Sequence, residues 1–274
     1  MPSKTKHKQI KAIFGGTFDP PHLGHLLPLQ ETADILELPE VSLMPANVPA
    51  LKQGISEGHH RIEMTRLLCE LDPRFKIDLT EFERDSISYT VNTLKYLKEK
   101  NANQSIIFII GLDSLQSLNK WHKWETLFNY CHLVVMLRPP LVTSVTSGVS
   151  INHNTDYKAL SNPNLGEVAL NLYEFYTSEE EFDTIVGKDL DKKTRLLLLS
   201  KLAQAENDQH SINHASFKDI ISNSTMGNLW FIKNHVLPIS SSEIRRKIKT
   251  GEALNNLVPQ SVLDYIHKHQ LYKI

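Results

Sequence analysis

The stretch Gly15-Gly16-Thr17-Phe18-Asp19-Pro20-Pro21-His22-Leu23-Gly24-His25 follows a short apolar run at residues 9–14. An apolar run that stops at two glycines predicts a buried strand ending in a tight loop, because glycine lets the backbone turn sharply and approach a ligand closely. A helical pattern follows at about residues 22–38, with Pro20 and Pro21 suited to its first turn. The free N–H groups at such a helix end predict an anion-binding site.

The alternation of strand and helix continues along the chain. Strands are expected at residues 41–44, 75–79, 105–110, 132–137 and 229–232, and helices at 58–71, 90–100, 124–130, 191–205, 241–250 and 259–269. Strands that alternate with helices in this way predict βαβ units around a parallel sheet. The strands are continuously apolar, which fits a sheet covered by helices on both faces. The expected fold class is therefore α/β, a Rossmann-like parallel sheet flanked by helices, with ligands at the carboxyl ends of the strands.

Residues 141–228 depart from this pattern, since they are rich in Ser, Asn and Thr and carry an acidic run at 179–181. Regular order resumes with the last strand and two C-terminal helices. We expect one α/β domain over residues 1–274, with a long insertion at about 141–228 before that strand. Part of the insertion should be folded, because structureless loops of this length are unusual.

Composition narrows the class of partner. The chain has 30 Lys and Arg against 31 Asp and Glu, and this balance disfavours a nucleic-acid partner while leaving room for a small phosphorylated ligand. Cys69 and Cys131 form no metal pattern and are expected to be buried thiols in a reducing compartment. The apolar runs are too short for a membrane span, so we expect no membrane partner and a cytoplasmic location. Composition leaves the oligomeric state open.

His22 and His25 lie three residues apart, so a helix places both on one face. Two imidazoles beside an anion site can donate hydrogen bonds to phosphate oxygens as charge builds on them, and we predict both as catalytic donors. Gly24 between them leaves room for a nucleotide. A metal site is the competing interpretation, but no third ligand lies nearby and none is expected. No GxxxxGK[ST] or GxGxxG pattern is present.

A second anion site is predicted at residues 240–245, where three serines precede a helix. A plain capping motif is the simplest interpretation, with Ser240 or Ser241 as N-cap and Glu243 in the first turn. Arg245 and Arg246 oppose the helix dipole there, which makes more sense if an anion lies close by. We therefore predict that this helix end and Arg245 hold the β- and γ-phosphates of a nucleoside triphosphate.

Together these motifs resemble the nucleotidyltransferase superfamily with a His-x-Gly-His motif, and closely the bacterial nicotinate-nucleotide adenylyltransferases. Further markers follow in order at residues 44–47 (Met-Pro-Ala-Asn), 60–64 (His-Arg-Ile-Glu-Met), 88–94, 108–115, 121–124 and 239–245, so that the resemblance covers residues 10–137 and 229–272. It implies transfer of AMP from ATP to nicotinate mononucleotide, giving deamido-NAD and pyrophosphate in NAD biosynthesis. It also implies Mg²⁺ on the leaving phosphates.

The resemblance further implies roles for individual residues beside the catalytic His22 and His25. For ATP binding it implies Gly15, Gly16, Thr17, Phe18, Gly24, Gly111, Asp113, Ser241, Ser242 and Arg245, with Asp113 accepting from ribose hydroxyls. For the pyridine nucleotide it implies Asn47, Lys52, Ser88, Tyr89, Thr90, Trp121 and Arg138. Tyr89 and Thr90 would face the carboxylate, and Trp121 would stack on the ring. If the resemblance is set aside, Trp121 can also be interpreted as a half-buried surface aromatic with no role in binding.

Two segments depart from the family pattern. After Asn47 the family usually continues Pro-Pro-His-Lys, whereas this chain has Val48-Pro49-Ala50-Leu51-Lys52. The family's Arg-Pro-Gly is replaced by Arg138-Pro139-Pro140. Both segments follow predicted strands, so they bear on the placement of Lys52 and Arg138.

Other functions remain open from the sequence. The acceptor could be nicotinamide mononucleotide, or another phosphate such as phosphopantetheine. A catalytically silent nucleotide sensor is an alternative of another class, although a sensor has no need to keep the transition-state donors His22 and His25. The insertion could also give a working enzyme a separate partner-binding role, although such segments are more often tolerated surface material.

Overall fold

The computed structural model describes residues 9–84, 86–137, 182, 190–206, 217, 220–221, 223–234, 239–254 and 257–273. Within them, six strands form one sheet in the order β3-β2-β1-β4-β5-β6, and all neighbouring pairs are parallel. The strands are β1 (Ile10–Gly16), β2 (Val41–Pro45), β3 (Phe75–Ile77), β4 (Ser105–Gly111), β5 (His132–Leu137) and β6 (Leu229–Lys233). This order reverses direction between β1 and β4, which is the switch point where Rossmann-like sheets bind ligands.

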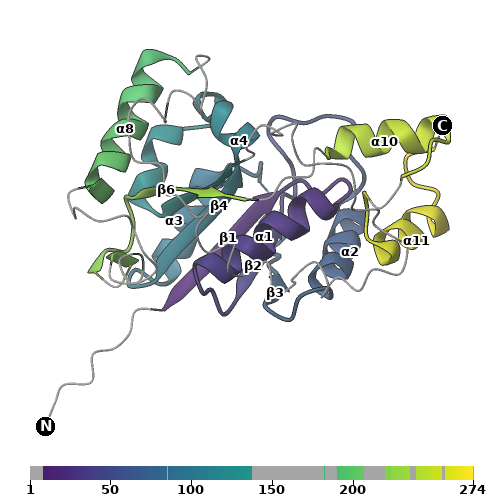
Figure 1. Ribbon diagram of the computed structural model, residues 1–274, viewed down its shortest axis with the longest axis horizontal. Helices are drawn as coiled ribbons and strands as arrows, with labels where there is room; N and C mark the ends of the chain where they lie inside the picture. The colour runs from purple at the N-terminus through teal and green to yellow at the C-terminus, as the bar shows by residue number, and fades with distance from the viewer. Residues whose placement is uncertain are drawn as a thin grey trace, which may run out of the picture.

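Helices cover both faces of the sheet (Figure 1). They are α1 (Leu23–Ile35), α2 (Gly58–Cys69), α3 (Thr90–Lys100), α4 (Leu112–Gln116), the 3₁₀ helices η1 (Leu118–Lys120) and η2 (Trp124–Asn129), then α8 (Lys192–Glu206), α10 (Ser241–Thr250) and α11 (Gln260–Lys268). Successive strand residues point to opposite faces, so Phe14 and Ile109 pack in a core with α1, α2, α10 and α11. Ile13 and Phe108 pack in a second core with α3, α4, η2 and α8. The predicted Rossmann-like α/β fold is confirmed.

Helix α1 begins within one residue of its predicted start at about residue 22, but Pro20 and Pro21 do not lie in its first turn as expected. Strand β1 runs through both glycines, which pair with Met44 and Pro45 of β2, and the helix begins only after His22, its N-cap. Pro20 and Pro21 therefore precede the first turn. The reason is tertiary: the carbonyl of Pro20 accepts a hydrogen bond from the Ser241 hydroxyl at 3.0 Å, so it points to α10 and not along α1. The helix also ends three residues earlier than expected, at Ile35.

Other predicted elements match within a few residues, and α3, β5 and α10 match at both ends. The predicted helix at 124–130 is the 3₁₀ helix η2, while α4 and η1 were missed because segments of five and three residues carry no readable periodicity. Helix α8 is the one predicted at 191–205 and packs near β6 at the end of the molecule away from α10 and α11 (Figure 1). Most of residues 141–228 lies outside the described residues, so a single domain with an insertion stays a prediction.

Candidate active site

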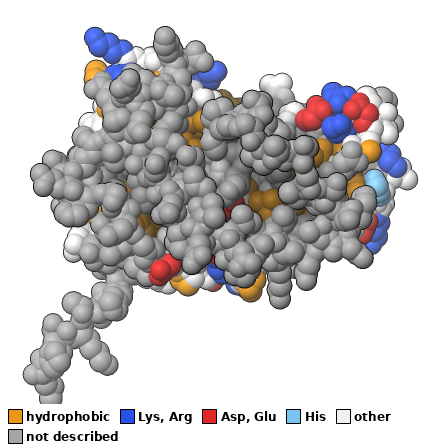
Figure 2. Space-filling model, in the orientation of Figure 1, with side chains coloured by type: hydrophobic (Ala, Val, Ile, Leu, Met, Phe, Trp, Pro, Cys, Tyr) orange, Lys and Arg blue, Asp and Glu red, His pale blue; other side chains and the backbone are white. Residues whose placement is uncertain are grey.

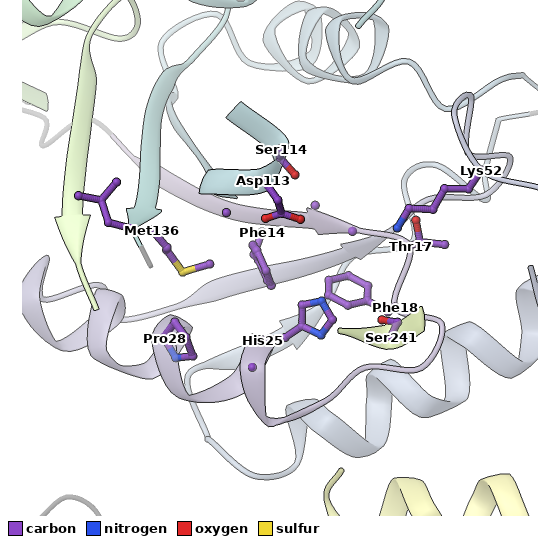
Figure 3. Close-up of a pocket in the computed structure, with 15 residues that line it drawn as sticks. Phe14, Thr17, Phe18, His25, Pro28, Lys52, Asp113, Ser114, Met136 and Ser241 are labelled. Atoms are coloured by element: carbon purple, nitrogen blue, oxygen red, sulfur yellow. The ribbon is translucent and has the colours of Figure 1, made fainter. Parts of the chain in front are cut away.

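A pocket opens at the carboxyl ends of β1 and β4, on the switch point of the sheet. It is lined by Phe14, Gly15, Gly16, Thr17, Phe18, Gly24, His25, Pro28, Lys52, Gly111, Asp113, Ser114, Met136, Leu137 and Ser241. Most residues predicted for ATP therefore meet around one cavity. Figure 3 shows Met136 and Pro28 toward one end of it, and Lys52, Thr17 and Ser241 toward the other. The cavity thus offers an apolar end and a polar end to a ligand.

Close packing leaves no room for a further side chain at the ends of both central strands unless a neighbouring side chain shifts. A Cβ atom on Gly15 would lie 2.9 Å from the Phe108 ring, and one on Gly111 would lie 2.7 Å from Oδ1 of Asp113. Real Cβ atoms essentially never approach other atoms this closely. The Asp113 carboxylate can therefore lie against the end of β4 and face the cavity (Figure 3) only because residue 111 has no side chain.

The two histidines stack on each other at the start of α1. Their ring centroids are 3.7 Å apart with an interplanar angle of 29°. The backbone N–H of His22 donates to Nδ1 of His25 at 3.2 Å. This bond leaves Nδ1 without a proton, so a neutral His25 carries its proton on Nε2, where it can donate. His25 lines the cavity, whereas His22 is only 2% exposed and is absent from the lining residues.

Helix α10 closes the polar end with its N-terminus. Ser240 is the N-cap and accepts a hydrogen bond from the backbone N–H of Glu243 at 3.2 Å. Ser241 lines the cavity, and Ser242 accepts a hydrogen bond from Arg245 at 3.4 Å. Arg246 forms ion pairs with Glu243 and Glu252, and Figure 2 shows charged side chains of both signs gathered at this end of the molecule. Arg246 is thus explained by surface pairing, and of the two arginines Arg245 is the one that could face an anion.

Arg245 turns toward the loop that follows β1. Its guanidinium donates to the backbone carbonyl of Asp19 at 2.6 Å and lies 3.8 Å from the Asp19 carboxylate. Arg245 is not among the residues that line the cavity. It lies at the rim and ties the β1 loop to α10. Lys52 does line the cavity; burial and the positive charge of Arg245 lower the pKa of its amino group, while Asp113 and Asp19 oppose this shift.

Apart from Lys52, the described residues predicted for the pyridine nucleotide form a neighbouring group and do not line this cavity. Tyr89 is the N-cap of α3 and stacks on His122, with ring centroids 4.3 Å apart. Ser88 accepts a hydrogen bond from the backbone N–H of Val48 at 3.1 Å, which joins the loops after β2 and before α3. Asn47 and Thr90 flank these loops, Trp121 is partly buried against the second core, and Arg138 lies outside the described residues.

Arg61 is a site residue that sequence reasoning missed. It is 1% exposed, and its guanidinium donates to the carbonyls of Ser56 at 3.0 Å, Thr17 at 3.3 Å and Asn47 at 2.9 Å, and to that of Ala46. One side chain therefore joins the loops that follow β1 and β2. One feature of the sequence could have indicated it. Arg61 lies in an amphipathic helix and within residues 60–64, which resemble a family motif.

This sheet order, with two helix N-termini facing a cavity at the switch point, is an arrangement suited to a nucleotidyltransferase. Residues 13–247 match the family model described as cytidylyltransferase-like. A relative from Yersinia pestis, named probable nicotinate-nucleotide adenylyltransferase, is 32% identical over all of both chains. One of the same name from Shewanella frigidimarina is 29% identical over 95% of this chain and 98% of its own. The chain belongs to the cytidylyltransferase-like family, and within it to the nicotinate-nucleotide adenylyltransferases.

Solved structures agree on the fold. The nicotinic acid mononucleotide adenylyltransferase of Plasmodium falciparum, complexed with NaAD, superposes with a TM-score of 0.58 over 97% of this chain and 98% of its own, at 19% identity. At that identity the likeness supports the architecture and not individual side chains. Among the described residues, no helix is long and apolar enough to cross a membrane.

Proposed function

We propose that this chain transfers the adenylyl group of ATP to nicotinate mononucleotide, giving deamido-NAD and pyrophosphate. The observation that carries the proposal is one cavity at the β1/β4 switch point, with His25 of α1 and Ser241 of α10 on its wall. Two helix N-termini beside one cavity suit a triphosphate, because each offers free N–H groups and the positive end of a dipole. The names of the relatives support nicotinate mononucleotide as the acceptor.

The two ends of the cavity suggest how ATP would lie. The apolar end, with Met136, Leu137 and Pro28, suits an adenine ring. Asp113, midway along the cavity, would accept hydrogen bonds from the ribose hydroxyls (Figure 3). The polar end, with Lys52, His25 and Ser241, would hold the phosphates. Gly15, Gly16, Thr17, Phe18 and Gly24 would form the floor beneath the nucleotide, Gly111 would leave the space that Asp113 occupies, and Ser242 and Arg245 would complete the phosphate end.

In the reaction, a phosphate oxygen of the acceptor attacks the α-phosphorus of ATP. The new P–O bond forms as the bond to the β-phosphate oxygen breaks, and pyrophosphate leaves. Nε2–H of His25 would donate to the oxygens on which charge develops, and its tautomer is already set by the His22 backbone. His22, stacked behind His25, would hold that ring in place and contribute to the same donor pair.

Adenylyl transfer from ATP typically uses a divalent metal ion, and we propose Mg²⁺. No group of three or more His, Cys, Asp or Glu within the described ranges could hold a metal ion. That fits an ion carried by the triphosphate, since Mg²⁺ keeps several waters and needs only one or two carboxylates beside the phosphates. With Asp113 assigned to the ribose, the phosphate oxygens and water would supply most ligands of the ion. The metal would neutralise charge on the departing pyrophosphate.

The acceptor would bind beside the cavity, between the loops after β2 and before α3. Thr90 begins α3, and the backbone groups of its first turn could receive the carboxylate of the pyridine. Tyr89, Ser88, Asn47, Lys52 and Trp121 would contact the rest of the mononucleotide. Trp121 is partly buried among apolar neighbours, so it would need one open face for stacking. Arg138 and a cytoplasmic location stay predictions.

Turnover with three acceptors tests the proposal. Purified protein, ATP and Mg²⁺ are mixed with nicotinate mononucleotide, nicotinamide mononucleotide or phosphopantetheine, and pyrophosphate release is followed. We expect kcat/KM to be highest for the acid, and a clear preference for the amide or for phosphopantetheine would refute the proposed substrate. A His25→Ala variant separates an enzyme from a sensor: loss of pyrophosphate release with ATP affinity retained supports catalysis, whereas no turnover in the wild type supports the sensor.

A further inference from the structure

The carboxylate of Asp19 lies at the centre of a contact among three distant segments. It is only 2% exposed. One oxygen accepts a hydrogen bond from the hydroxyl of Tyr272 at 2.7 Å, and the other accepts one from the backbone N–H of Ser56 at 3.2 Å. The second oxygen also lies 3.8 Å from the guanidinium of Arg245. Asp19 therefore joins the β1 loop to the segment before α2, to α10, and to the segment after α11.

The segment after α11 is shaped to deliver Tyr272 to this point. The backbone N–H of Leu271 donates to the carbonyl of Ile266 at 3.0 Å, so the chain folds back over the end of α11. Tyr272 has a φ of 64°, in the left-handed region that tyrosine seldom adopts. Its ring packs against the first core near Met64. Burial and the negative charge of Asp19 raise the pKa of Tyr272, so its hydroxyl stays protonated and donates.

The segments that meet at Asp19 include part of the phosphate end of the cavity. Its own backbone carbonyl accepts from Arg245, and the next carbonyl, that of Pro20, accepts from Ser241. Both partners belong to the first turns of α10, and two residues later the chain reaches His22. A change in the orientation of the Asp19 carboxylate would therefore move Arg245 and the serine end of α10 relative to His25.

We propose that Tyr272 is a positioning residue for ATP, which acts through Asp19 to fix Arg245 and the N-terminus of α10 at the phosphate end of the cavity. The inference rests on the proposed function only in that ATP is the nucleotide. Tyr272 does not line the cavity, so it touches no reacting atom. Its hydroxyl acts on the nucleotide by orienting Asp19.

The test compares two tyrosines that lie close together in the sequence. Tyr272→Phe removes only the hydroxyl that bonds Asp19. Tyr265→Phe is the matched control, because that hydroxyl bonds Nδ1 of His60 at 2.9 Å, between α11 and α2. For each variant we measure the affinity for ATP by calorimetry without acceptor, the KM for ATP and for nicotinate mononucleotide, and the thermal midpoint.

We expect Tyr272→Phe to weaken ATP binding and raise the KM for ATP roughly tenfold, within the range by which residues that contact no ligand alter the affinity of a site. The KM for nicotinate mononucleotide should stay near that of the wild type, while the thermal midpoint should fall by a few degrees because a buried carboxylate loses one donor. Tyr265→Phe should change neither KM. Asp19→Asn should weaken ATP binding likewise, and adding Tyr272→Phe to it should weaken binding little further, because both act through one contact.

Unchanged ATP affinity in Tyr272→Phe overturns the inference. So does an equal rise in both KM values, or a variant that does not fold, since either indicates a purely structural role. The proposed function is tested separately by wild-type turnover. A wild type that binds ATP but releases no pyrophosphate with any acceptor would defeat the proposed reaction, while the calorimetric comparison of Tyr272→Phe would still decide the role of Tyr272.

Discussion

Replacing Arg61 with methionine keeps an unbranched apolar stem of similar length and removes the guanidinium. Four partly buried backbone carbonyls, those of Thr17, Ala46, Asn47 and Ser56, then lose their donor. A buried acceptor left without a partner costs about 1–3 kcal/mol. Part of this loss is offset, because the buried guanidinium itself carries a desolvation penalty that its removal returns. That same burial lowers the pKa of Arg61.

We therefore expect Arg61→Met to reduce the free energy of unfolding by roughly 3 kcal/mol. This lies below the range of about 4–12 kcal/mol for four fully buried unpaired carbonyls, because these carbonyls are only partly buried and the desolvation penalty of the guanidinium is returned. Urea denaturation followed by circular dichroism measures this as a shift in the midpoint with little change in slope. The variant should also raise the KM for both substrates, because Arg61 joins the loop of Thr17 to the loop of Asn47.

Arg66→Met is the matched control on the same helix. Arg66 is exposed and pairs with Glu63 at 3.4 Å, and an exposed pair of this kind contributes about 0.5 kcal/mol or less. If Arg61→Met were no more destabilising than Arg66→Met, the interpretation of Arg61 as the tie between the two loops would be refuted. A large loss of stability with both KM values unchanged would refute its effect on the site.

Four further outcomes are expected. His25→Ala should lower kcat roughly 10²- to 10³-fold, the usual result of removing one preorganised donor, and should change the KM for ATP far less in steady-state assays. Gly111→Ala should raise the KM for ATP roughly 10- to 100-fold, because its Cβ would meet the Asp113 carboxylate at 2.7 Å; an unchanged KM would remove Asp113 from the ribose site. Burial and the positive charges of His59 and His269 lower the pKa of His60 from 6.5. As the pH drops below that value, the unfolded chain takes up the proton first, so the stability of the folded protein falls. The urea midpoint should therefore decrease between pH 7.5 and 5, and His60→Gln should make this decrease smaller. Chelation by EDTA should abolish pyrophosphate release and added Mg²⁺ should restore it, while persistent turnover in excess chelator would contradict a role for the metal ion.

The elements of this fold could be located from the sequence because each carries its own local pattern. The apolar residues 105–110 are continuous because both faces of β4 are covered, and Val91, Leu94 and Leu97 repeat at helical spacing because α3 buries one face. Failures occurred where a distant segment decides the local structure. Pro20 looked like the first turn of a helix, but its carbonyl is taken by Ser241, which lies 221 residues away.

The candidate site likewise contains residues that local sequence could identify and residues that only distant contacts place. Gly15, His25 and Ser241 belong to short motifs whose chemistry can be argued from neighbouring residues, and all three reach the cavity. Sequence spacing alone could not place His22 behind His25, because that depends on which ring packs inward. Nor could it find Arg61, whose partners are backbone carbonyls and so leave no pattern of side-chain types. Residues that position others are the part of a site that spacing does not reveal.

The hydrogen bond between Tyr272 and Asp19 joins residues 253 positions apart. During synthesis at 5–20 residues per second, Asp19 leaves the ribosome roughly 10–50 s before Tyr272 is made. Strands β1 and β2 can pair in that interval, but the phosphate end of the cavity lacks both α10 and its tie to the later segment. The nascent chain therefore acquires its sheet well before it acquires an ordered nucleotide site, and ATP can stabilise the protein only after nearly all of it has been translated.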